Sequence, residues 1–469
     1  MASLAGKEVW GTSSQVTLAG LGDINMQNEP TLQTSETIEK VAQTTCCIVG
    51  AGPAGAVLAL LLARQGIPVM LLEEHMDFDR DFRGDTIHPS VMQIMDEIGL
   101  ADRLLQIPHS QLYSIPVQTS NGTVTLGDFR RLKTRYPYIA MIPQVHFLEF
   151  ITTEVKNYPN SQLVMGARVE KLIEENGKIC GVHYRGQDGW HEVRALLTVG
   201  ADGRFSRLRR LAGWEPVKTA QAMDVLWFRL PTRTGDSEQS SGRIAKGHVL
   251  ILLHRLAPTR AADESTSAQL DGVPEEDYWQ IGYVIPKGGY QKIHAAGLDA
   301  LRRELAEMMP EFADRLDYIQ AWKQISVLSV ESSRLRRWYR PGLLLIGDAA
   351  HVMSPVAGVG INYAIQDAVI AANVLSAPLS KGHIEVRDLA AVQRKREWPT
   401  RIIQGFQNLI QRRFVSGVLD SDKPVVLPSM VRFLLRIPVL RDLPARFIGF
   451  GIWPVHVKET VIPTRTKQQ

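Results

Sequence analysis

Uninterrupted apolar runs at three places along the chain predict strands that are buried on both faces. These runs are Cys46–Val49, Val69–Leu72 and Leu343–Ile346, and none alternates with polar residues as a half-exposed strand does. An apolar helical pattern, Ala56–Arg64, separates the first two runs. A strand, a helix and a second strand over this length form a βαβ unit, so the pattern predicts a parallel sheet covered by helices.

Shorter patterns between these runs predict further strands, helices and turns. Short strands recur between 162 and 199, with turns at Gly177 and at 186–189. A polar stretch, Thr259–Glu276, interrupts the strand-like runs that follow. The further predicted elements are strands Val225–Leu230, Val249–His254 and Gln280–Ile285, helices Ser90–Gly99, Val145–Val155 and Leu298–Met309, and a hairpin Tyr113–Phe129 that turns at Asn121-Gly122.

The order of these patterns predicts an α/β fold in which one domain is interrupted by another. We expect a Rossmann-like domain over 44–210 and 336–380, and a mixed-sheet substrate domain over 211–335. The hairpin near 111–130 is a candidate for joining the substrate sheet. Residues 1–43 are rich in Ser, Thr, Gln, Asn and Gly, and we expect a disordered tail there.

Bulk composition excludes several classes of protein. The 469 residues carry a formal net charge of only +4, and no basic stripe with interleaved aromatics predicts a nucleic-acid partner. The cysteines, Cys46, Cys47 and Cys180, lack metal-ligand spacing, so we expect no metal site and a reducing compartment. Residues 1–40 lack an apolar signal-peptide core, and no long apolar segment predicts a membrane span. We therefore expect a cytoplasmic protein.

Positive charge is concentrated in the last part of the chain, 381–469, where we expect a helical C-terminal region. This region holds 16 Lys and Arg residues against 7 Asp and Glu residues. Within it, Val431–Lys458 mixes arginines with Phe, Leu, Ile and Trp, which is typical of segments at an anionic membrane surface. We favour the alternative, a helical cap on the first domain with its arginines toward solvent, over peripheral membrane contact.

The first buried strand leads into a glycine-rich turn, Gly50-Ala51-Gly52-Pro53-Ala54-Gly55, which opens the apolar helix. Gly50 permits the tight turn, Gly52 lets the backbone approach a pyrophosphate, and Gly55 allows close helix–sheet packing. Free N–H groups at the helix N-terminus then face the phosphates. Glu73 follows the second strand at the spacing of an acid that binds a ribose hydroxyl. The arrangement predicts a dinucleotide site.

Two further motifs follow the glycine-rich turn in a specific order. They are Asp202-Gly203-x-x-Ser206-x-x-Arg209, then Gly347-Asp348-Ala349-Ala350-His351 with Pro355, Gly358, Gly360 and Asn362. With these three motifs the chain resembles the group A FAD-dependent monooxygenases of the para-hydroxybenzoate hydroxylase type. Within that superfamily it is also similar to the bacterial ubiquinone-hydroxylase-like oxidoreductases. The resemblance extends from about Thr45 to Leu375.

The resemblance implies a glutathione-reductase-type FAD-binding domain and a set of cofactor contacts. Backbone N–H groups of Ile361 and Asn362 would face flavin N1 and O2, where a helix N-terminus also favours the negative charge of reduced flavin. The glycine-rich turn would hold the pyrophosphate and Glu73 the adenosine ribose. The implied cofactor-binding positions are Gly50, Gly52, Ala54, Gly55, Glu73, Glu74, Arg83, Gln144, Asp202, Gly347, Asp348, Gly358, Gly360, Ile361 and Asn362.

Some of these positions have an ordinary structural alternative. Asp348 can be a helix N-cap, Asp202 a turn residue, and Arg83 a solvated charge. The resemblance implies catalytic positions at Pro355, near flavin C4a, and at Asn362. We expect His351 to be structural.

The implied reaction is hydroxylation of an aromatic, quinol-like or lipophilic small molecule by O2, through a flavin C4a-hydroperoxide. NADPH or NADH would be a transient electron donor. Glu74 stands where the family often carries a basic residue for the NADPH phosphate, and its charge repels that phosphate, so both donors stay open. Candidate pocket-lining residues, which as aromatic strand residues can equally belong to the core, are Trp227, Phe228, Trp279 and Tyr283.

Other functions of the same fold also remain open. A reductase of prenyl-type double bonds would use the same FAD site without oxygen. A flavin-dependent halogenase is the other alternative, because 279–286 matches the motif Trp-x-Trp-x-Ile-Pro in part, although the second tryptophan is missing. A non-enzymatic FAD protein is the least favoured of these interpretations.

Overall fold

The structure is a computed structural model, and the residues that it describes are 38–79, 84–119, 122–237, 239–245, 247–256, 277–412 and 438–458. Several predictions lie outside these residues. They concern the tail up to residue 37, Arg83, Asn121 of the hairpin turn, the polar stretch Thr259–Glu276, and the part of the C-terminal region between 413 and 437.

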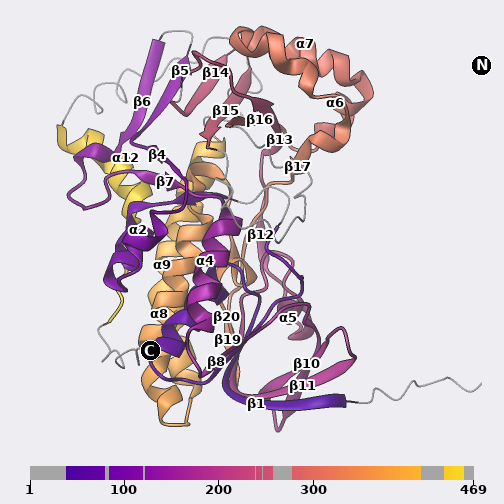
Figure 1. The fold of residues 1–469 in the computed structure, drawn as a ribbon, viewed down its shortest axis with the longest axis vertical. Helices are drawn as coiled ribbons and strands as arrows, with labels where there is room; N and C mark the ends of the chain where they lie inside the picture. Colours follow the sequence, from indigo (N-terminus) through magenta and orange to yellow (C-terminus); the bar gives the residue numbers. More distant parts are fainter. Residues whose placement is uncertain are drawn as a thin grey trace, which may run out of the picture. The chain divides into compact units, whose positions relative to one another are not determined.

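An eight-stranded sheet forms the centre of the dinucleotide domain (Figure 1). Its strand order is β19-β20-β11-β1-β2-β8, and β10 and β9 extend from β11 in antiparallel pairing. Strands β20, β11, β1, β2 and β8 are parallel, as predicted. The bounds are β1 Ile38–Val49, β2 Val69–Leu72, β8 Ser161–Val164, β9 Arg168–Glu175, β10 Lys178–Arg185, β11 Trp190–Gly200, β19 Tyr339–Arg340 and β20 Leu343–Leu345.

Strand β1 begins at Ile38, so the predicted disordered tail is wrong for 38–43. The first half of β1 mixes apolar with polar residues and is mostly exposed, so it does not continue the apolar run that predicted the strand. Residues Ile38–Thr44 instead pair with Trp190–Ala195 of β11. Backbone pairing with a neighbouring strand therefore extends β1 beyond its buried part.

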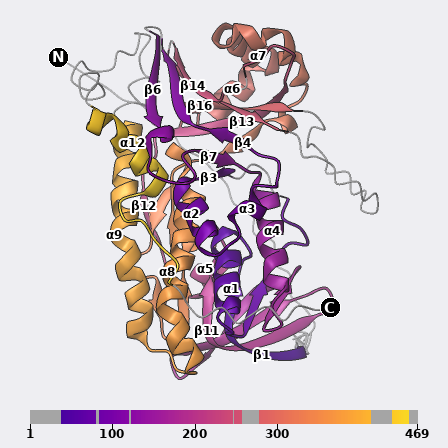
Figure 2. The same ribbon diagram turned by 60° about the vertical axis from the view of Figure 1, so that its left-hand side comes forward.

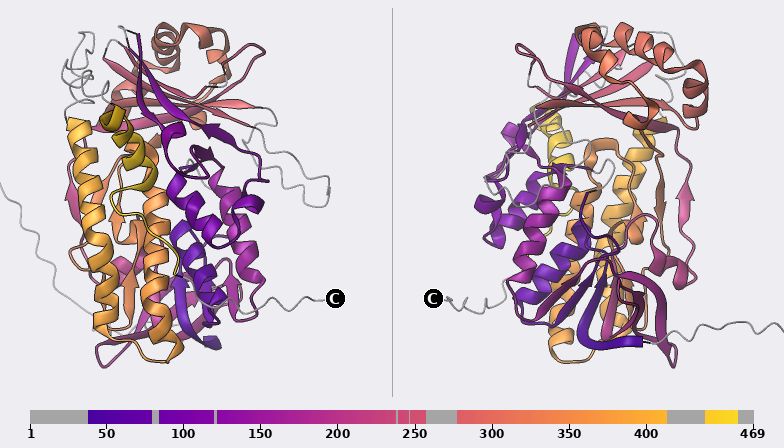
Figure 3. Two further views of the ribbon diagram at one scale, coloured as in Figure 1. Left: turned by 90° about the vertical axis from the view of Figure 1, so that its left-hand side faces the viewer. Right: turned by 45° about the vertical axis from the view of Figure 1, so that its right-hand side comes forward.

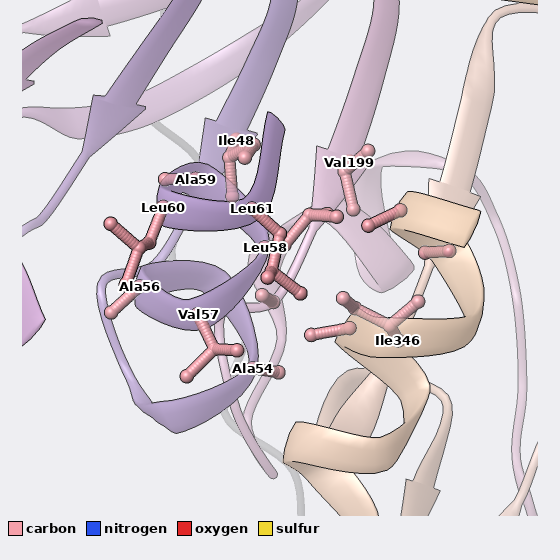
Figure 4. Packing of buried hydrophobic residues seen from close by; sticks show 14 of the residues in the cluster. Ile48, Ala54, Ala56, Val57, Leu58, Ala59, Leu60, Leu61, Val199 and Ile346 are labelled. Atoms are coloured by element: carbon pink, nitrogen blue, oxygen red, sulfur yellow. The ribbon is translucent and has the colours of Figure 1, made fainter. Parts of the chain in front are cut away.

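Helix α1 (Pro53–Arg64) is apolar all round because it is covered on every side. It packs against α8 (Gly360–Ser380), α4 (Gln144–Lys156) and the sheet. Figure 4 shows side chains of α1, Leu58 and Leu61 among them, close to residues of the strands and of the turn before α8. This packing fixes the start of α1 relative to the start of α8.

A seven-stranded sheet forms the substrate domain, in the order β17-β13-β16-β15-β14-β5-β6. The hairpin β5–β6 joins it, as predicted, through parallel pairing of β5 with β14. The bounds are β5 Ser114–Thr119, β6 Gly122–Asp128, β13 Met223–Pro231, β14 Ser241–Ala245, β15 His248–Arg255, β16 Tyr278–Pro286 and β17 Ser326–Leu328.

Helices α6 (Tyr290–Ala296) and α7 (Leu298–Met308) cover one face of this sheet (Figure 3). Phe228, Trp279 and Tyr283 lie on the covered face, in a core shared with α7. Their candidacy as pocket-lining residues is therefore wrong, because successive strand residues point to opposite faces. Trp227 belongs to the other face.

Two three-stranded sheets, β3-β7-β4 and β12-β18-β21, complete the described strands. Helix α9 (Val386–Ile410) packs along α8 (Figure 2), and α12 (Pro438–Phe450) packs on β6 and α2. The helical cap that we favoured was predicted to turn its arginines toward solvent, but Arg396 of α9 is only 1% exposed. No helix among the described residues combines the length and apolarity that crossing a membrane requires. The other bounds are α2 Pro89–Glu97, α3 Ala101–Leu104, α5 Arg207–Leu211, β3 Thr86–Ile87, β4 Ser110–Leu112, β7 Ile139–Met141, β12 Val217–Thr219, β18 Ser332–Arg334 and β21 His351–Val352.

Candidate flavin site

Two helix N-termini without side-chain caps form the framework of the site. Helix α1 has Gly52 as its N-cap and α8 has Val359, and neither residue offers a capping side chain. Helix α1 directly follows the parallel strand β1, whereas β21 lies between the parallel strand β20 and α8, and the two helices pack against each other. The carboxyl edge of a parallel sheet is where such folds bind ligands. Two positive helix ends are thus available for anionic groups.

The glycine-rich turn has the shape that a pyrophosphate requires. A Cβ on Gly50, whose φ is +98°, would lie 2.5 Å from the carbonyl oxygen of Ala201, and a Cβ on Gly55 would lie 1.9 Å from that of Gly50. Both glycines are therefore required by the packing. A Cβ on Gly52 would meet no described atom within 4 Å, so Gly52 borders open space at the start of α1. The shape of this glycine-rich turn fits the pyrophosphate of FAD.

Glu73 is fixed against this turn at the end of β2. Its Oε2 atom accepts a hydrogen bond of 2.8 Å from the N–H of Ala51, and its Oε1 accepts one of 3.2 Å from the N–H of His75. Glu74 is instead exposed, and its Oε1 lies 3.2 Å from Nε of Arg168. The structure therefore brings Glu73 to the glycine-rich turn and directs Glu74 toward an arginine.

The Asp202 motif folds back on itself. Oδ1 of Asp202 accepts a hydrogen bond from Oγ of Ser206 at 2.6 Å, and Oδ2 of Asp202 accepts one from the N–H of Leu208 at 2.9 Å. Burial raises the pKa of Asp202, and these two hydrogen bonds oppose the rise. Arg209 joins this motif to the third motif by donating to the carbonyl oxygen of Ala349 at 3.0 Å. The geometry supports the turn role of Asp202, and its contact with FAD stays a prediction.

A buried ion cluster holds the third motif in place. Asp367 accepts hydrogen bonds from the N–H of Gly347 at 2.9 Å and from Nε of Arg396 at 2.6 Å, and Nε2 of His351 lies 2.6 Å from it. Burial alone would raise the pKa of Asp367, but His351 and Arg396 together lower it to about 2. His351 has the structural role that was expected. Asp348, on the same turn, is half-buried.

Two glutamines of helix α9, and a third at its C-cap, hold the loop that carries Pro355. Gln404 donates to the carbonyl oxygen of Val352 at 3.0 Å, and Gln407 donates to those of Ser354 and Val356, at 2.8 Å each. Gln411 donates to the hydroxyl of Ser354. Sequence reasoning missed these residues, although their spacing of three and four places them on one face of α9. They fix the backbone on both sides of Pro355.

Asn362 uses its side chain to join two segments of backbone. Its Oδ1 accepts from the N–H of His88 at 2.8 Å, and its Nδ2 donates to the carbonyl oxygens of Thr86 at 3.1 Å and Gly358 at 3.3 Å. The side chain is therefore a positioning group, and the implied catalytic role of Asn362 stays a prediction. The backbone N–H groups of Ile361 and Asn362 lie in the first turn of α8, as the flavin contact requires.

The backbone around these residues is tightly constrained. Ala357 has a left-handed φ of +66°. This conformation is strained for a residue other than glycine, and strained residues of this kind cluster at functional sites. A Cβ on Gly358 would lie 2.8 Å from Oγ1 of Thr86. Gly360 begins α8, and Gln144 begins α4 with its N–H 3.3 Å from Oδ1 of Asp85. The predicted residues of the third motif thus gather with 84–88, a segment that the motif search did not include.

The face of the substrate sheet that carries Trp227, opposite α6 and α7, lies against this loop. Val356, next to Pro355, packs in a cluster with Trp227. A Cβ on Gly282 would lie 2.8 Å from the indole of Trp227, so this glycine makes room for the ring. No group of three or more His, Cys, Asp or Glu side chains in the described chain is arranged to hold a metal ion.

Comparisons with known proteins agree with this site. Residues 43–400 match the family described as FAD binding domain. The 6-methylpretetramide 4-monooxygenase of Streptomyces rimosus is 32% identical over 420 residues, which cover 89% of this chain and 94% of the relative. The ubiquinone hydroxylase UbiL of Rhodospirillum rubrum is 28% identical and is matched over 72% of this chain and 73% of its own.

A solved structure shows the same fold. The OxyS anhydrotetracycline hydroxylase from Streptomyces rimosus superposes with a TM-score of 0.64 at 21% identity, and the match covers 87% of this chain and 76% of that chain. The predicted α/β fold with a dinucleotide domain and mixed sheets is confirmed. The chain belongs to the FAD binding domain family and, within it, to the group A FAD-dependent monooxygenases.

Proposed function

We propose that the protein hydroxylates a planar phenolic or quinol-like small molecule, using O2 and a reduced nicotinamide as the electron donor. The observation that carries this proposal is the contact between Val356, beside Pro355, and the Trp227 face of the substrate sheet. A flat apolar substrate placed against this face would lie next to the loop that approaches the flavin. FAD, when bound, supplies the redox and oxygen chemistry, and the chain orients the substrate and excludes water.

The relatives support the substrate class. The relative from Streptomyces rimosus is a 6-methylpretetramide 4-monooxygenase, which acts on a polyketide, and the relative from Rhodospirillum rubrum is a ubiquinone hydroxylase. At 32% and 28% identity they indicate a kind of molecule rather than one compound. We therefore propose a multi-ring phenol, of which aromatic polyketides are the leading kind.

Both nicotinamide donors remain in the proposal. The exposed carboxylate of Glu74 disfavours the extra phosphate of NADPH, but Arg168 and Arg207 lie 3.2 Å and 4.0 Å from it and offset its charge. The free cysteines Cys46, Cys47 and Cys180 support the proposed cytoplasmic location.

The test is turnover by the full-length, FAD-loaded protein under isotopically labelled O2. Each donor is supplied with a panel of naphthols, anthraquinols and benzoquinols, and products are weighed by mass spectrometry. The proposal expects one labelled oxygen atom in the product and faster donor oxidation when substrate is present. A panel in which no compound gains labelled oxygen or stimulates donor oxidation would contradict it. Anaerobic reduction of a prenyl chain, or bromide incorporation, would point to the reductase or the halogenase instead.

A further inference from the structure

The face of the substrate sheet opposite α6 and α7 changes from apolar to polar along its strands. Residues on this face come from alternate positions of β13, β16 and β15. The successive rows of cross-strand neighbours are Trp227–Gly282–Ile251, then Arg229–Gln280–Leu253, then Tyr278–Arg255. The apolar end packs against Val356. A molecule on this face would therefore meet rings and aliphatic groups at one end and polar groups at the other.

Arg255 is the buried cation at the polar end. Its side chain is only 3% exposed, and its Nη2 atom lies 2.9 Å from Oδ2 of Asp85. The other oxygen of Asp85 accepts a hydrogen bond from the N–H of Gln144 at 3.3 Å. One arm of the guanidinium is thus fixed by a carboxylate whose own position is fixed by helix α4.

The other two nitrogens of Arg255 have no acceptor among the residues that the structure describes. Nε and Nη1 are buried and make no hydrogen bond within the described part of the chain. A buried donor without a partner destabilises the folded protein, and more so when the donor is charged. Arg243 of the same sheet provides a contrast, because its Nε, Nη1 and Nη2 atoms all donate to protein acceptors.

The Arg255–Asp85 pair is linked to the loop that carries Pro355 through Thr86, the residue after Asp85. Asp85 directly precedes Thr86, whose hydroxyl donates to the carbonyl oxygen of Gly358 at 2.9 Å. The backbone of Thr86 also accepts a hydrogen bond from Asn362. The buried guanidinium therefore belongs to the same region as the Pro355 loop.

We propose that Nε and Nη1 of Arg255 bind an ionised oxygen of the substrate, a phenolate or an enolate. The rings of this substrate would contact Trp227 and Ile251 at the apolar end. This inference rests on the proposed function. A guanidinium recognises an anionic oxygen by charge-assisted hydrogen bonds and favours the ionised form of a phenol, in which the ring is more electron-rich and more easily hydroxylated.

The test measures binding to the oxidised, FAD-loaded, full-length protein, so it does not depend on turnover. The probes are lawsone, a hydroxynaphthoquinone that is ionised at neutral pH, and its methyl ether, which cannot ionise. Calorimetry is expected to show that the wild-type protein binds lawsone at least about tenfold more tightly than the ether. Arg255→Met is expected to abolish this preference and to leave binding of the ether almost unchanged.

Three further variants keep the result interpretable. Asp85→Asn combined with Arg255→Met removes both charges, so that no carboxylate is left buried and unpaired. Arg255→Lys keeps the charge and is expected to retain only part of the preference, because it lacks the guanidinium fork. Arg243→Met is the matched control and is expected to keep the full preference.

Three outcomes would overturn the inference. The wild-type protein could bind both probes equally, or the double variant could still prefer lawsone. Arg255 variants could also release FAD while the Arg243 variant retains it, which would assign Arg255 to the cofactor. A protein that fails the hydroxylation assay but shows the Arg255-dependent preference would refute the proposed function and leave the anion site standing.

Discussion

The Oδ1 atom of Asn362 lies 2.8 Å from the backbone nitrogen of His88, although 274 positions separate the two residues in the chain. This hydrogen bond ties the start of helix α8 to the segment that begins helix α2. It holds the backbone N–H groups of Ile361 and Asn362 where the pyrimidine edge of a flavin is expected. We therefore expect the position of the flavin ring to depend on an asparagine side chain that does not itself need to touch the flavin.

Replacing Asn362 with alanine is expected to weaken FAD binding and to lower stability. The N–H of His88 and the carbonyl oxygen of Thr86 would lose their partners, at a cost of about 1–3 kcal/mol. Fluorescence titration of the apoprotein with FAD and chemical unfolding measure the two effects. Asn373→Ala, which removes hydrogen bonds at the surface, is the control. Unchanged FAD affinity in the Asn362 variant would contradict the positioning role.

Replacing Gly52 with alanine is expected to weaken FAD binding without destabilising the apoprotein. The new Cβ meets no described protein atom within 4 Å, but it enters the space where a pyrophosphate would approach. FAD affinity should fall at least about tenfold, which corresponds to about 1.4 kcal/mol. Gly405→Ala, also in open space but on helix α9, should leave FAD affinity unchanged. Equal affinities for both variants would show that the pyrophosphate lies elsewhere.

The ion pairs of Asp367 are expected to make the free energy of unfolding depend on pH in the acid range. The folded-state pKa of Asp367 is lowered to about 2, below its ordinary value of about 3.9. The stabilisation is therefore complete above about pH 4 and is lost as pH falls toward 2. Asp367→Asn leaves Arg396 buried and unpaired and should cost about 3–5 kcal/mol at neutral pH.

Urea unfolding at a series of pH values measures this dependence. The difference between the wild-type protein and Asp367→Asn should shrink as pH falls from about 4 to 2, because the wild-type carboxylate becomes protonated. Glu385→Gln, at an exposed ion pair with Arg387, is the control and should cost less than about 1 kcal/mol. A difference that is constant with pH would refute the lowered pKa.

Gln407→Leu is expected to uncouple donor oxidation from hydroxylation. It removes two hydrogen bonds to the loop that carries Pro355, at the carbonyl oxygens of Ser354 and Val356. A looser loop would admit water, so a larger share of the electrons would form hydrogen peroxide. The ratio of product formed to donor consumed measures this share. In the wild-type protein, Asn408 accepts a hydrogen bond from Gln221 rather than from the loop. Asn408→Ala should therefore keep the wild-type ratio.

Trp227 and Phe228 are expected to respond differently to truncation, because they lie on opposite faces of β13. Trp227→Leu should raise the KM for a substrate at least about tenfold, since it removes apolar contact area. Phe228→Ala should instead lower the unfolding free energy by about 3–5 kcal/mol. Steady-state kinetics and urea unfolding distinguish the two effects. A Phe228 variant that raises KM without losing stability would contradict this prediction, because it would place the substrate pocket on the face covered by α6 and α7.

The sequence alone was sufficient for the dinucleotide domain, because its signals are local. A buried strand, a glycine-rich turn and an apolar helix are adjacent in the chain, and the requirement for glycine at 50 and 55 comes from backbone geometry. The parallel sheet could be predicted on this basis, the hairpin from its own turn residues, and the family from the resemblance that three separated motifs carry. Residues 38–43 could not, because their strand is held by pairing with β11 rather than by an apolar pattern.

Only the tertiary structure decided which side chains face the site. Trp227 and Phe228 are neighbours in sequence, yet one faces the flavin loop and the other the helices, and the sequence does not tell which face is covered. Asn362, Gln407 and Arg255 act through partners that are distant in the chain, at His88, Ser354 and Asp85. A local pattern records the requirements of the backbone, whereas these contacts depend on how separate elements pack in space.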